Sequence, residues 1–240
     1  MDGVIVIDKP EGWTSHDVVN KVRGIARTKK VGHLGTLDPL ATGVLPLVIE
    51  RATRLAQFYT RSDKIYEGVV RFGWSTSSYD RAGEPTSEKV EIQFSPAELE
   101  AALEPFRGEI DQRPPDVSAK KVDGRRAYEL ARKNIAVDLP PVRIHVYELT
   151  LLGSSGNEAR LRVHCSGGTY MRSIAHDLGQ ALGCGAHLTE LRRLASGEFE
   201  IDRPGPWSNC RRWPTTTGWW TRACRRKNYC PSFPVCTSMN

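Results

Sequence analysis

The sequence lacks the long apolar segments that mark membrane proteins. No run of apolar residues approaches the roughly 20 needed to cross a bilayer. The first residues, Met1-Asp2-Gly3-Val4, also lack the basic segment and apolar stretch of a secretion signal. We therefore expect a cytoplasmic protein without a membrane segment. Its 240 residues are enough for one large domain, or for a domain with an appendage.

The cysteines lack the paired spacing of a metal site. None of the six occurs in a C-x-x-C pair, the spacing that zinc sites commonly use. Cys165 and Cys184 lie in the main part of the chain, and the other four lie after residue 207. In a cytoplasmic protein we expect these thiols to be reduced. Internal repeats and low-complexity segments are also missing.

Acidic residues are missing from the C-terminal part of the chain. Residues 203–240 contain seven Lys or Arg and no Asp or Glu, so they carry +7, and residues 1–202 carry −1 of the net +6. Net charge therefore says little about the main part, where RNA binding would need local basic clusters. The candidate clusters are Lys29-Lys30, Lys120-Lys121 and Arg125-Arg126.

The last part of the chain also differs in composition. Residues 207–240 hold four of the six tryptophans and four of the six cysteines, with no hydrophobic periodicity. Such a composition is unlike an ordinary folded module and unlike an ordinary disordered segment. We therefore predict one domain over residues 1–206 and an atypical tail, without an assigned domain, over residues 207–240.

The first fifth of the chain contains a strand, a helix and a loop. The apolar β-branched run at residues 3–7 predicts a buried strand. Ser15 is placed to cap a helix in which Val18, Val22, Ile25 and Ala26 share one face. Residues 28–46 contain three glycines and two prolines, which predicts a long ordered loop. Loops of this length in a compact domain are usually functional or disordered, and this one is too apolar for disorder.

The rest of the main part mixes strands with separate helices. Alternation predicts a strand over residues 66–72 and a hairpin from residues 142–152 and 158–165. Ser95-Pro96-Ala97-Glu98 is a capping box with proline at the first helical position, and an apolar stripe predicts a second helix over residues 171–182. Long hairpins mixed with separate helices favour an α+β fold over a βαβ repeat.

The segment from Gly32 to Gly43 reads G-H-L-G-T-L-D-P-L-A-T-G and carries the most informative carboxylate. By itself, Asp38 before a proline is most often a residue that begins a turn. Two features also favour a chemical role. Pro39 disfavours a helical backbone at Asp38 and so restricts how the carboxylate is presented, and the flanking Leu37 and Leu40 can wall it from bulk water. A carboxylate in such a place needs a cation as its partner.

Seven motifs, collinear over residues 3–202, resemble those of the TruB family of pseudouridine synthases. The segment around Asp38 resembles the family's G-H-x-G-x-L-D-P-x-A-T-G motif almost letter for letter. The other matches, in chain order, are Asp8–Ser15 to D-K-P-x-G-x-T-S, Lys64-Ile65-Tyr66 to K-x-Y, residues 76–83 to T-x-T-x-D-x-x-G with Ser78 for threonine, residues 113–124 to P-P-x-x-S-A-x-K-x-x-G, residues 168–173 to G-T-Y-I/V-R-S/T, and His187–Leu194 to H-L-x-x-L-R-R-x. One match would be weak, but seven in the same order are specific.

The resemblance implies both a fold and an activity. The fold would be the α+β pseudouridine synthase fold, with a mixed, mostly antiparallel central sheet, flanking helices and an RNA-binding insertion loop. The activity would be the isomerisation of uridine to pseudouridine at position 55 of the tRNA T-loop. The N1–C1′ bond breaks, the uracil turns in place, and a C5–C1′ bond forms. The family needs no cofactor and no metal. Its partner is the T-arm of tRNA, no protein partner is implied, and we expect a monomer.

The resemblance assigns the chemistry to Asp38, Tyr66 and Arg172. Asp38 would stabilise or trap the electron-poor C1′, or remove a 2′ proton. Arg172 would be its charge partner, because a partly buried carboxylate left unpaired would protonate or be destabilising. Without the motif, Arg172 reads as a surface arginine at a helix start. Tyr66 would stack on the flipped uracil and assist proton loss from C5, although its apolar strand face also fits a core aromatic.

The resemblance also assigns residues to the substrate. His33 would lie where the base has left the stack, although it also fits an ordinary loop histidine. Tyr170 and Leu191 would line the uracil pocket, and either also fits the core. Asp80 would form hydrogen bonds near the active site, with a structural role equally open.

Lys9 and Lys64 are expected to contact phosphates, together with basic residues of 120–126, which would make the affinity salt-dependent. Two departures from the family pattern stand out. Val117 replaces an aromatic residue that is usual there, which is expected to loosen packing under the 113–125 loop. The tail also lacks the strand alternation of a small RNA-binding β-domain that follows position 200 in many relatives, so we expect a lower tRNA affinity.

Two other functions stay open. A catalytically impaired protein of the same fold that binds and folds tRNA would not need Asp38, Tyr66 and Arg172 together. A carboxylate-dependent hydrolase of a small glycoside would need a second acid, and no second acidic motif of comparable character occurs. Activity on free uridine would favour the hydrolase, and dependence on folded RNA would exclude it.

Overall fold

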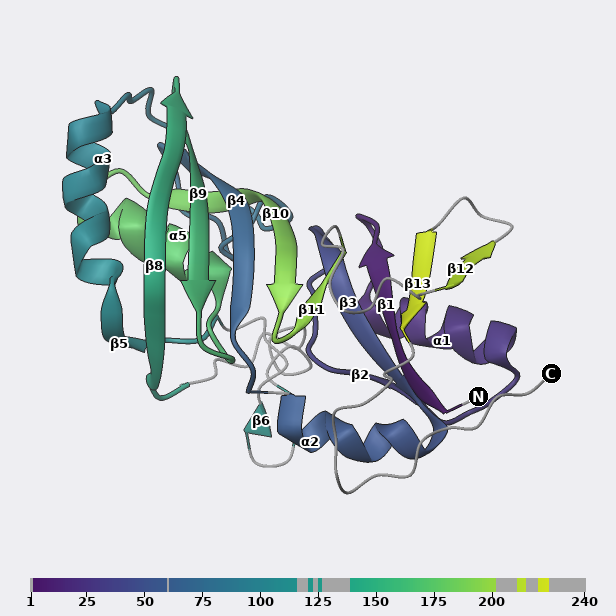
Figure 1. Ribbon diagram of the computed structural model, residues 1–240. Helices are drawn as coiled ribbons and strands as arrows, with labels where there is room; N and C mark the ends of the chain where they lie inside the picture. Colours follow the sequence, from purple (N-terminus) through teal and green to yellow (C-terminus); the bar gives the residue numbers. More distant parts are fainter. Residues whose placement is uncertain are drawn as a thin grey trace. The chain divides into compact units, whose positions relative to one another are not determined.

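The computed structural model describes residues 2–59, 61–115, 121–122, 125–126, 139–201, 211–214 and 220–224. The chain forms two compact units, whose helices and strands are labelled in Figure 1. Unit 1 contains residues 1–62 and 192–240, and unit 2 contains residues 63–191. Within the described part of the chain, no helix is long and apolar enough to cross a membrane.

Unit 1 is built on an antiparallel sheet with the strand order β12-β13-β1-β3, in which β2 also pairs with β3. Helix α1 packs against β2. The elements are β1 (Gly3–Lys9), α1 (Ser15–Ala26), β2 (Val31–His33), β3 (Ala41–Ile49), the 3-10 helix η1 (Glu50–Leu55), α2 (Ala56–Tyr59), the end of β10 (Ala186–Ser196), β11 (Phe199–Glu200), β12 (Arg211–Pro214) and β13 (Trp220–Cys224).

The paired strands β1 and β3 form the core of unit 1. Their register places Ile5 opposite Leu47 and Ile7 opposite Leu45. All four side chains are buried. Near-continuous apolar runs of this kind are typical of strands covered on both faces, which confirms the predicted strand at residues 3–7.

The prediction of one loop over residues 28–46 is wrong. Residues 31–33 form β2, and β3 begins at Ala41, so only residues 34–40 connect the two strands. The prolines and glycines suggested a loop, but long-range pairing of β3 with β1 decides the backbone. Pro46 lies within β3, opposite Val6, and its carbonyl accepts a hydrogen bond from the Leu34 amide (2.9 Å). Proline is tolerated in a strand where the position need not donate an N–H.

The N-cap of helix α1 lies one residue earlier than predicted. Thr14, not Ser15, is the N-cap, and its side chain and the Asp17 carboxylate bind each other's backbone amides in a capping box. Val18 and Val22 are buried as predicted, but Ile25 is 43% exposed. The helix therefore buries a narrower face than its sequence suggested.

Part of the tail joins the sheet of unit 1. Strand β13 pairs antiparallel with β1, with Val4 opposite Cys224 and Ile7 opposite Thr221, and β12 pairs with β13. The sequence showed no strand periodicity here. The predicted boundary between residues 206 and 207 lies outside the described residues and stays a prediction.

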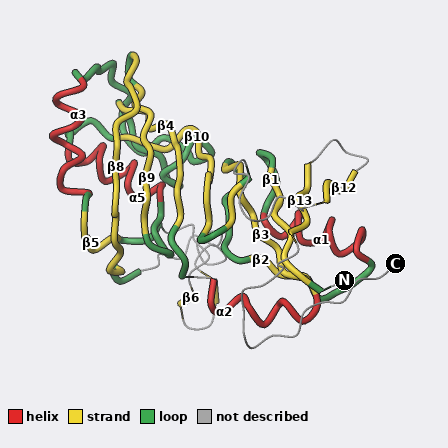
Figure 2. The backbone as a smooth tube through the Cα atoms, in the orientation of Figure 1, coloured by secondary structure: helices red, strands yellow, loops and turns green. Residues whose placement is uncertain are grey.

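Unit 2 contains five neighbouring strands with two helices packed against them. Its strand order is β10-β4-β9-β8-β5, and the pairs β4–β9, β8–β9 and β5–β8 are antiparallel. Helix α3 packs against β8, α5 packs against β4, and the two helices contact each other (Figure 2). The elements are β4 (Lys64–Phe72), α3 (Pro96–Leu103), the 3-10 helix η2 (Glu104–Phe106), β5 (Gly108–Gln112), β6 (Lys121–Val122), β7 (Arg125–Arg126), β8 (Val142–Ser155), β9 (Glu158–Cys165), α5 (Met171–Ala181) and the start of β10.

The elements predicted in unit 2 are confirmed. Strand β4 covers residues 66–72, and β8 and β9 form the expected hairpin. In β9 the alternate side chains Ala159, Leu161, Val163 and Cys165 are buried. Ser95 caps α3 with the predicted box and proline. Helices beside a mostly antiparallel sheet confirm the α+β class.

The predicted insertion loop is described only in part. β6 and β7 pair antiparallel, with Lys121 opposite Arg126. Val117 and Lys120 lie outside the described residues, as do the side chains of these two strands. The predicted phosphate contacts at residues 120–126 therefore stay predictions.

Candidate active site

The loop that carries Asp38 is held by backbone hydrogen bonds at both ends. The Leu34 amide donates to Pro46 O (2.9 Å), and the Ala41 amide donates to Asp38 O (3.0 Å). The Gly12 amide, from the segment before α1, donates to Pro39 O (2.8 Å). A seven-residue connection between β2 and β3 is thus fixed from two sides.

Ser15 binds the middle of this loop. Its hydroxyl donates to Leu37 O (3.0 Å) and accepts from the Leu37 amide (2.8 Å), so both backbone polar groups of Leu37 are satisfied inside the protein. Ser15 is 2% exposed and Leu37 is 3% exposed. Asp38 follows directly and is only half-buried. The backbone before the carboxylate is therefore anchored in the core, while Asp38 itself reaches the surface.

The two leucines that flank the Asp38-Pro39 pair differ in burial. Leu37 is buried, as the wall predicted beside Asp38 requires, whereas Leu40 is only half-buried. Leu34, at the start of the loop, is 1% exposed. The apolar support therefore lies mainly on the side of the loop that precedes the carboxylate.

Lys9, the last residue of β1, is 0% exposed. Its ammonium donates to Pro10 O (2.9 Å), Trp13 O (2.7 Å) and, more weakly, Pro39 O (3.4 Å). Burial lowers the pKa of Lys9 from 10.5 to about 8; the Asp38 carboxylate opposes this shift, and the Arg193 guanidinium adds to it. These contacts favour a role in holding the loop over the predicted contact with phosphate.

Strand β10 contributes two arginines to unit 1. Arg192 forms a two-pronged ion pair with Asp8 (Nη1–Oδ1 3.0 Å and Nη2–Oδ2 2.9 Å), and both side chains are partly exposed. Arg193 is 1% exposed, and its guanidinium donates to carbonyls on both sides of the Asp38 loop. Sequence analysis placed both residues in a family motif but gave neither a role.

His33 lies at the end of β2, where the loop begins. Its ring is half-buried, and its Nδ1 lies 3.4 Å from the Gly35 amide. The sequence placed His33 in one loop with Asp38, but His33 is the last residue of β2 and only residues 34–40 connect β2 to β3. Its predicted position against the RNA stays a prediction.

Arg172 is buried in unit 2, near the start of α5. It is 5% exposed, so the alternative of a surface arginine is wrong. Its Nη1 donates to Ser78 O (3.0 Å), and its Nε lies 3.8 Å from Asp80 Oδ2. Helical periodicity missed this burial because residues 76–83, and not a neighbouring helix, cover this side of α5. The predicted pair between Arg172 and Asp38 stays a prediction.

Asp80 is the most thoroughly bonded carboxylate of the site residues. Its Oδ1 accepts from the Ser78 hydroxyl (2.6 Å) and from the Ala82 amide (3.0 Å), and its backbone carbonyl accepts from Thr76 Oγ1 (2.7 Å). Asp80 is 6% exposed and forms an isolated bridge with Leu188 of β10. Its surroundings favour the structural role that the sequence left open, with Arg172 as the group that it orients.

Tyr66 and Leu191 share one face of β4. Tyr66 and Gly68 point the same way because alternate residues of a strand share a face. A Cβ added to Gly68 would lie 3.3 Å from Leu191 Cδ1, so Leu191 covers this position. Both side chains are 8% exposed. Leu191 of β10 therefore packs beside the face of β4 that carries Tyr66, and these are two of the three residues predicted to contact the uracil; a core role is compatible with the same burial.

Lys64 precedes Tyr66 on the same strand face and is 5% exposed. Its backbone carbonyl lies 3.8 Å from Cys165 Sγ on the paired strand β9. A contact of the Lys64 ammonium with phosphate would require the end of a largely buried side chain to reach the surface. The contact of Lys64 with phosphate stays a prediction.

Tyr170 is positioned by a residue that the sequence analysis did not identify. The Gln112 side chain donates to Tyr170 O (3.0 Å) and accepts from the Tyr170 amide (2.8 Å). Gln112 is 3% exposed, and Tyr170 is half-buried at the start of α5. No sequence signal marks Gln112, because it acts through a tertiary contact 58 residues away.

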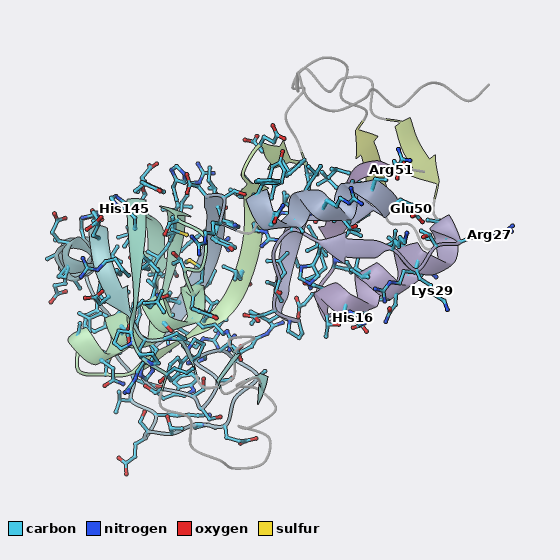
Figure 3. The ribbon with its side chains drawn as sticks, turned by 90° about the horizontal axis from the view of Figure 1, so that it is seen from below. His16, Arg27, Lys29, Glu50, Arg51 and His145 are labelled. Atoms are coloured by element: carbon cyan, nitrogen blue, oxygen red, sulfur yellow. The ribbon has the colours of Figure 1, made fainter. Side chains whose placement is uncertain are left out.

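One predicted basic cluster lies on the surface of unit 1. Figure 3 shows Arg27, Lys29, Glu50 and Arg51 near one another, at the end of α1 away from His16. The loop after α1 is tied to η1 because the Glu50 amide donates to Lys30 O (2.8 Å) and its carboxylate accepts from the Thr28 hydroxyl. Contact of this cluster with RNA stays a prediction. Across the described residues, no group of three or more His, Cys, Asp and Glu could hold a metal ion.

Two family models together match most of the chain. The TruB family pseudouridylate synthase N-terminal domain matches residues 23–171, and the tRNA pseudouridylate synthase B C-terminal domain matches residues 172–204. A tRNA pseudouridine synthase B of Solibacter usitatus (strain Ellin6076) is 84% identical over 203 residues, which are 85% of this chain and 69% of that protein. One of Salmonella typhi is 47% identical over 201 residues, 84% of this chain and 64% of that protein.

Solved structures support the same assignment. The chain is similar to one in the crystal structure of a Cbf5-Nop10-Gar1 complex, with a TM-score of 0.66 and 35% identity, over 83% of this chain and 50% of that chain. The protein thus spans about two thirds of the curated relatives and half of this solved chain. Its α+β fold, its collinear motifs and these matches agree: the chain belongs to the TruB family of pseudouridylate synthases.

Proposed function

We propose that this chain isomerises uridine to pseudouridine at position 55 of the tRNA T-loop, with Asp38 as the reacting carboxylate. The two curated relatives named above are tRNA pseudouridine synthases B. The observation that carries the role of Asp38 is the construction of its loop. Ser15 and Lys9 bind the loop backbone from the buried side, while Asp38 is half-buried at the surface.

The reaction is an isomerisation, so it consumes no second substrate. The N1–C1′ bond of uridine breaks, the uracil rotates within the site, a C5–C1′ bond forms, and the proton on C5 is lost while N1 gains one. An ionised Asp38 would act either by attacking C1′ or by removing a 2′ proton. Uracil is a delocalised leaving group and is retained, so a second acid of the glycosidase kind is not required.

The residues of unit 2 would bind the base and balance its charge. Tyr66 would stack on the extruded uracil and assist the loss of the C5 proton, with Leu191 and Tyr170 lining the pocket. Arg172 would pair with the Asp38 carboxylate, since a guanidinium is the strongest partner for a partly desolvated carboxylate. Asp80 would orient Arg172 from behind, through the contact 3.8 Å long.

The proposed partner is the T-arm of tRNA. Lys9, Lys64 and the basic residues of 120–126 are the candidates for contact with its phosphates, and of these Lys9 and Lys64 are buried in the protein alone. His33 would lie against the RNA where the base has left the stack. We infer that the protein acts as a monomer in the cytoplasm, without a cofactor.

The test is tritium release from tRNA labelled at C5 of uridine, for wild type and Asp38→Asn. C5 loses its hydrogen only if the new bond to C1′ forms, so release reports the complete reaction. We expect release by the wild type and at least about a 10³-fold loss in Asp38→Asn, the scale seen when a reacting residue is removed. Asp38→Asn should still bind tRNA, because the amide keeps the shape of the loop.

A protein of the same fold that only binds and folds tRNA is the second candidate. Its expected result is tight tRNA binding by a folded wild type that releases no tritium. Full turnover by Asp38→Asn would instead reject Asp38 as the reacting residue while keeping the activity. Hydrolysis of free uridine would favour the glycoside hydrolase.

A further inference from the structure

Arg193 is the largest fully buried side chain that contacts the Asp38 loop. Its Nε donates to Val44 O (2.7 Å), its Nη2 to Gly35 O (3.1 Å) and its Nη1 to Thr36 O (3.3 Å). Gly35 and Thr36 precede Asp38, and Val44 follows it in β3. One planar guanidinium therefore links the two ends of the loop.

Burying this charge is costly unless its donors are satisfied. Within the described part of the chain, the Arg193 guanidinium donates to backbone carbonyls, and only an arginine presents several donors in a fixed plane that can bind three of them together. A lysine ammonium also has three donors, but all three lie on one nitrogen, whereas Arg193 donates from three separate nitrogens held in one plane. The geometry thus selects arginine for its shape as well as its charge.

The backbone of Arg193 also packs directly against the loop. A Cβ added to Gly43 would lie 2.2 Å from Arg193 O and 2.9 Å from Arg193 N, so only glycine permits this approach. Gly43 has a φ of +101°, which side chains rarely adopt. Strand β10 and the end of the loop are consequently in contact through both the side chain and the backbone of Arg193.

The charges of this region interact. The pKa of Lys9 responds to both the Asp38 carboxylate and the Arg193 guanidinium, in opposite directions. Two buried cations therefore lie in the electrostatic range of the Asp38 loop.

We propose that Arg193 is a positioning residue for the proposed reaction: by holding the carbonyls of Gly35, Thr36 and Val44 it fixes where the Asp38 carboxylate is presented, without touching the substrate. This inference rests on the proposed function of Asp38. Displacing a reacting group by about 1 Å can cost a factor of 10² in rate, so loosening the loop should slow chemistry far more than it weakens binding.

The test compares Arg193→Lys with two controls. Arg192→Lys changes the neighbouring arginine, whose ion pair with Asp8 is partly exposed, and Val22→Ala removes buried volume from α1, outside residues 34–44. For each variant we would measure the melting temperature, the dissociation constant for tRNA, the single-turnover rate of tritium release, and hydrogen exchange in peptides covering residues 34–44.

We expect Arg193→Lys to lower the single-turnover rate by about 10²-fold while the dissociation constant stays within about threefold. Hydrogen exchange should rise in residues 34–44 and not in α1. Arg192→Lys and Val22→Ala should keep the single-turnover rate within about threefold. This should hold for Val22→Ala even if its melting temperature is as low as that of Arg193→Lys, because a loss of stability alone should not slow the reaction. Arg193→Ala supplies a second variant, in which added guanidinium should restore part of the rate.

Three results would overturn the inference. The first is an Arg193→Lys protein with wild-type rate, and the second is a rate loss no larger than that of a Val22→Ala protein of equal melting temperature. The third is a rate loss without increased exchange in residues 34–44. A wild type that makes no pseudouridine would instead reject the proposed function itself, and the exchange data would still show whether Arg193 orders the loop.

Discussion

The Asp38 loop of unit 1 and the 76–83 segment of unit 2 present carboxylates in opposite ways. Asp80 is 6% exposed, and its carboxylate accepts from the Ser78 hydroxyl and the Ala82 amide beside the buried Arg172. Around Asp38 the buried contacts go to the backbone of the loop, through Ser15 and Arg193, and the residue itself is half-buried. The contacts of Asp80 hold its own carboxylate in place, whereas those of Ser15 and Arg193 hold the backbone that carries Asp38 at a half-buried position.

The largest expected effect is on the free energy of unfolding, which Asp80→Asn should lower far more than Asp38→Asn. Asp80→Asn should lower the free energy of unfolding by about 3 kcal/mol, because Arg172 stays buried while its acidic neighbour loses its charge. Asp38→Asn, at a half-buried position, should change it by no more than about 1 kcal/mol. Thermal and urea unfolding of both variants measure the difference. Equal destabilisation by the two variants would contradict the structural role of Asp80.

Gln112 tests how unit 2 holds the start of α5. Gln112→Ala should cost about 2 kcal/mol, because the buried amide and carbonyl of Tyr170 each lose a hydrogen-bond partner. Gln112→Met fills nearly the same space without the amide group, so it separates the hydrogen bonds from the cavity. A stable Gln112→Met protein would show that packing, and not the two hydrogen bonds, accounts for the loss. Unfolding by urea provides the measurement.

Ser15 is the counterpart of Gln112 in unit 1, because it also binds both polar groups of one backbone residue. Ser15→Ala should cost about 1 kcal/mol and, because Leu37 precedes Asp38, should slow the single-turnover rate about tenfold. Thr14→Ala is the matched control. It loses the cap of α1 at a cost of about 1 kcal/mol without contacting Leu37, so its rate should not change. Similar rates for both variants would contradict the link between Leu37 and the chemistry.

The smallest effect concerns the buried ammonium of Lys9. Its pKa is lowered to about 8 in the folded protein, so folding is penalised at a pH below 8, where Lys9 is charged in both states. Between about pH 8 and 10.5 the folded protein has released this proton while the unfolded chain retains it. Stability therefore rises with pH in this window, by up to about 1 kcal/mol per unit.

The matched variant for Lys9 is Lys9→Met, which has no titrating group. The difference in unfolding free energy between wild type and Lys9→Met should shift in favour of the wild type from pH 8 to 10.5. Other titrating groups contribute equally to both proteins and cancel. A constant difference over this range would show that the Lys9 pKa is not lowered.

Local sequence patterns predicted most of the separate elements. The strand at residues 3–7, the capping box at Ser95 and the buried alternation of β9 follow from propensity and periodicity within a few residues. They were predictable because each signal lies within the element itself. The family motif likewise placed His33 and Asp38 close together along the chain, at the end of β2 and in the connection that follows it.

The errors of prediction share a physical cause. Residues 41–46 were assigned to a loop because of their glycine and proline content, but pairing with β1 makes them a strand. Ser15 was assigned to the helix cap, but its hydroxyl binds Leu37, 22 residues away. Arg172 appeared to lie on the polar side of its helix, but residues 76–83 cover it. In each case a contact distant in sequence overrides the local preference.

The sequence by itself determined the α+β class, the family and the candidate carboxylate Asp38. Only the tertiary structure decided which groups hold that carboxylate in place. Arg193 lies 149 residues after Val44, and Gln112 lies 58 residues before Tyr170. Buried polar groups must find partners wherever the fold provides them, so these pairs follow from the packing of strands and loops and leave no local pattern in the sequence.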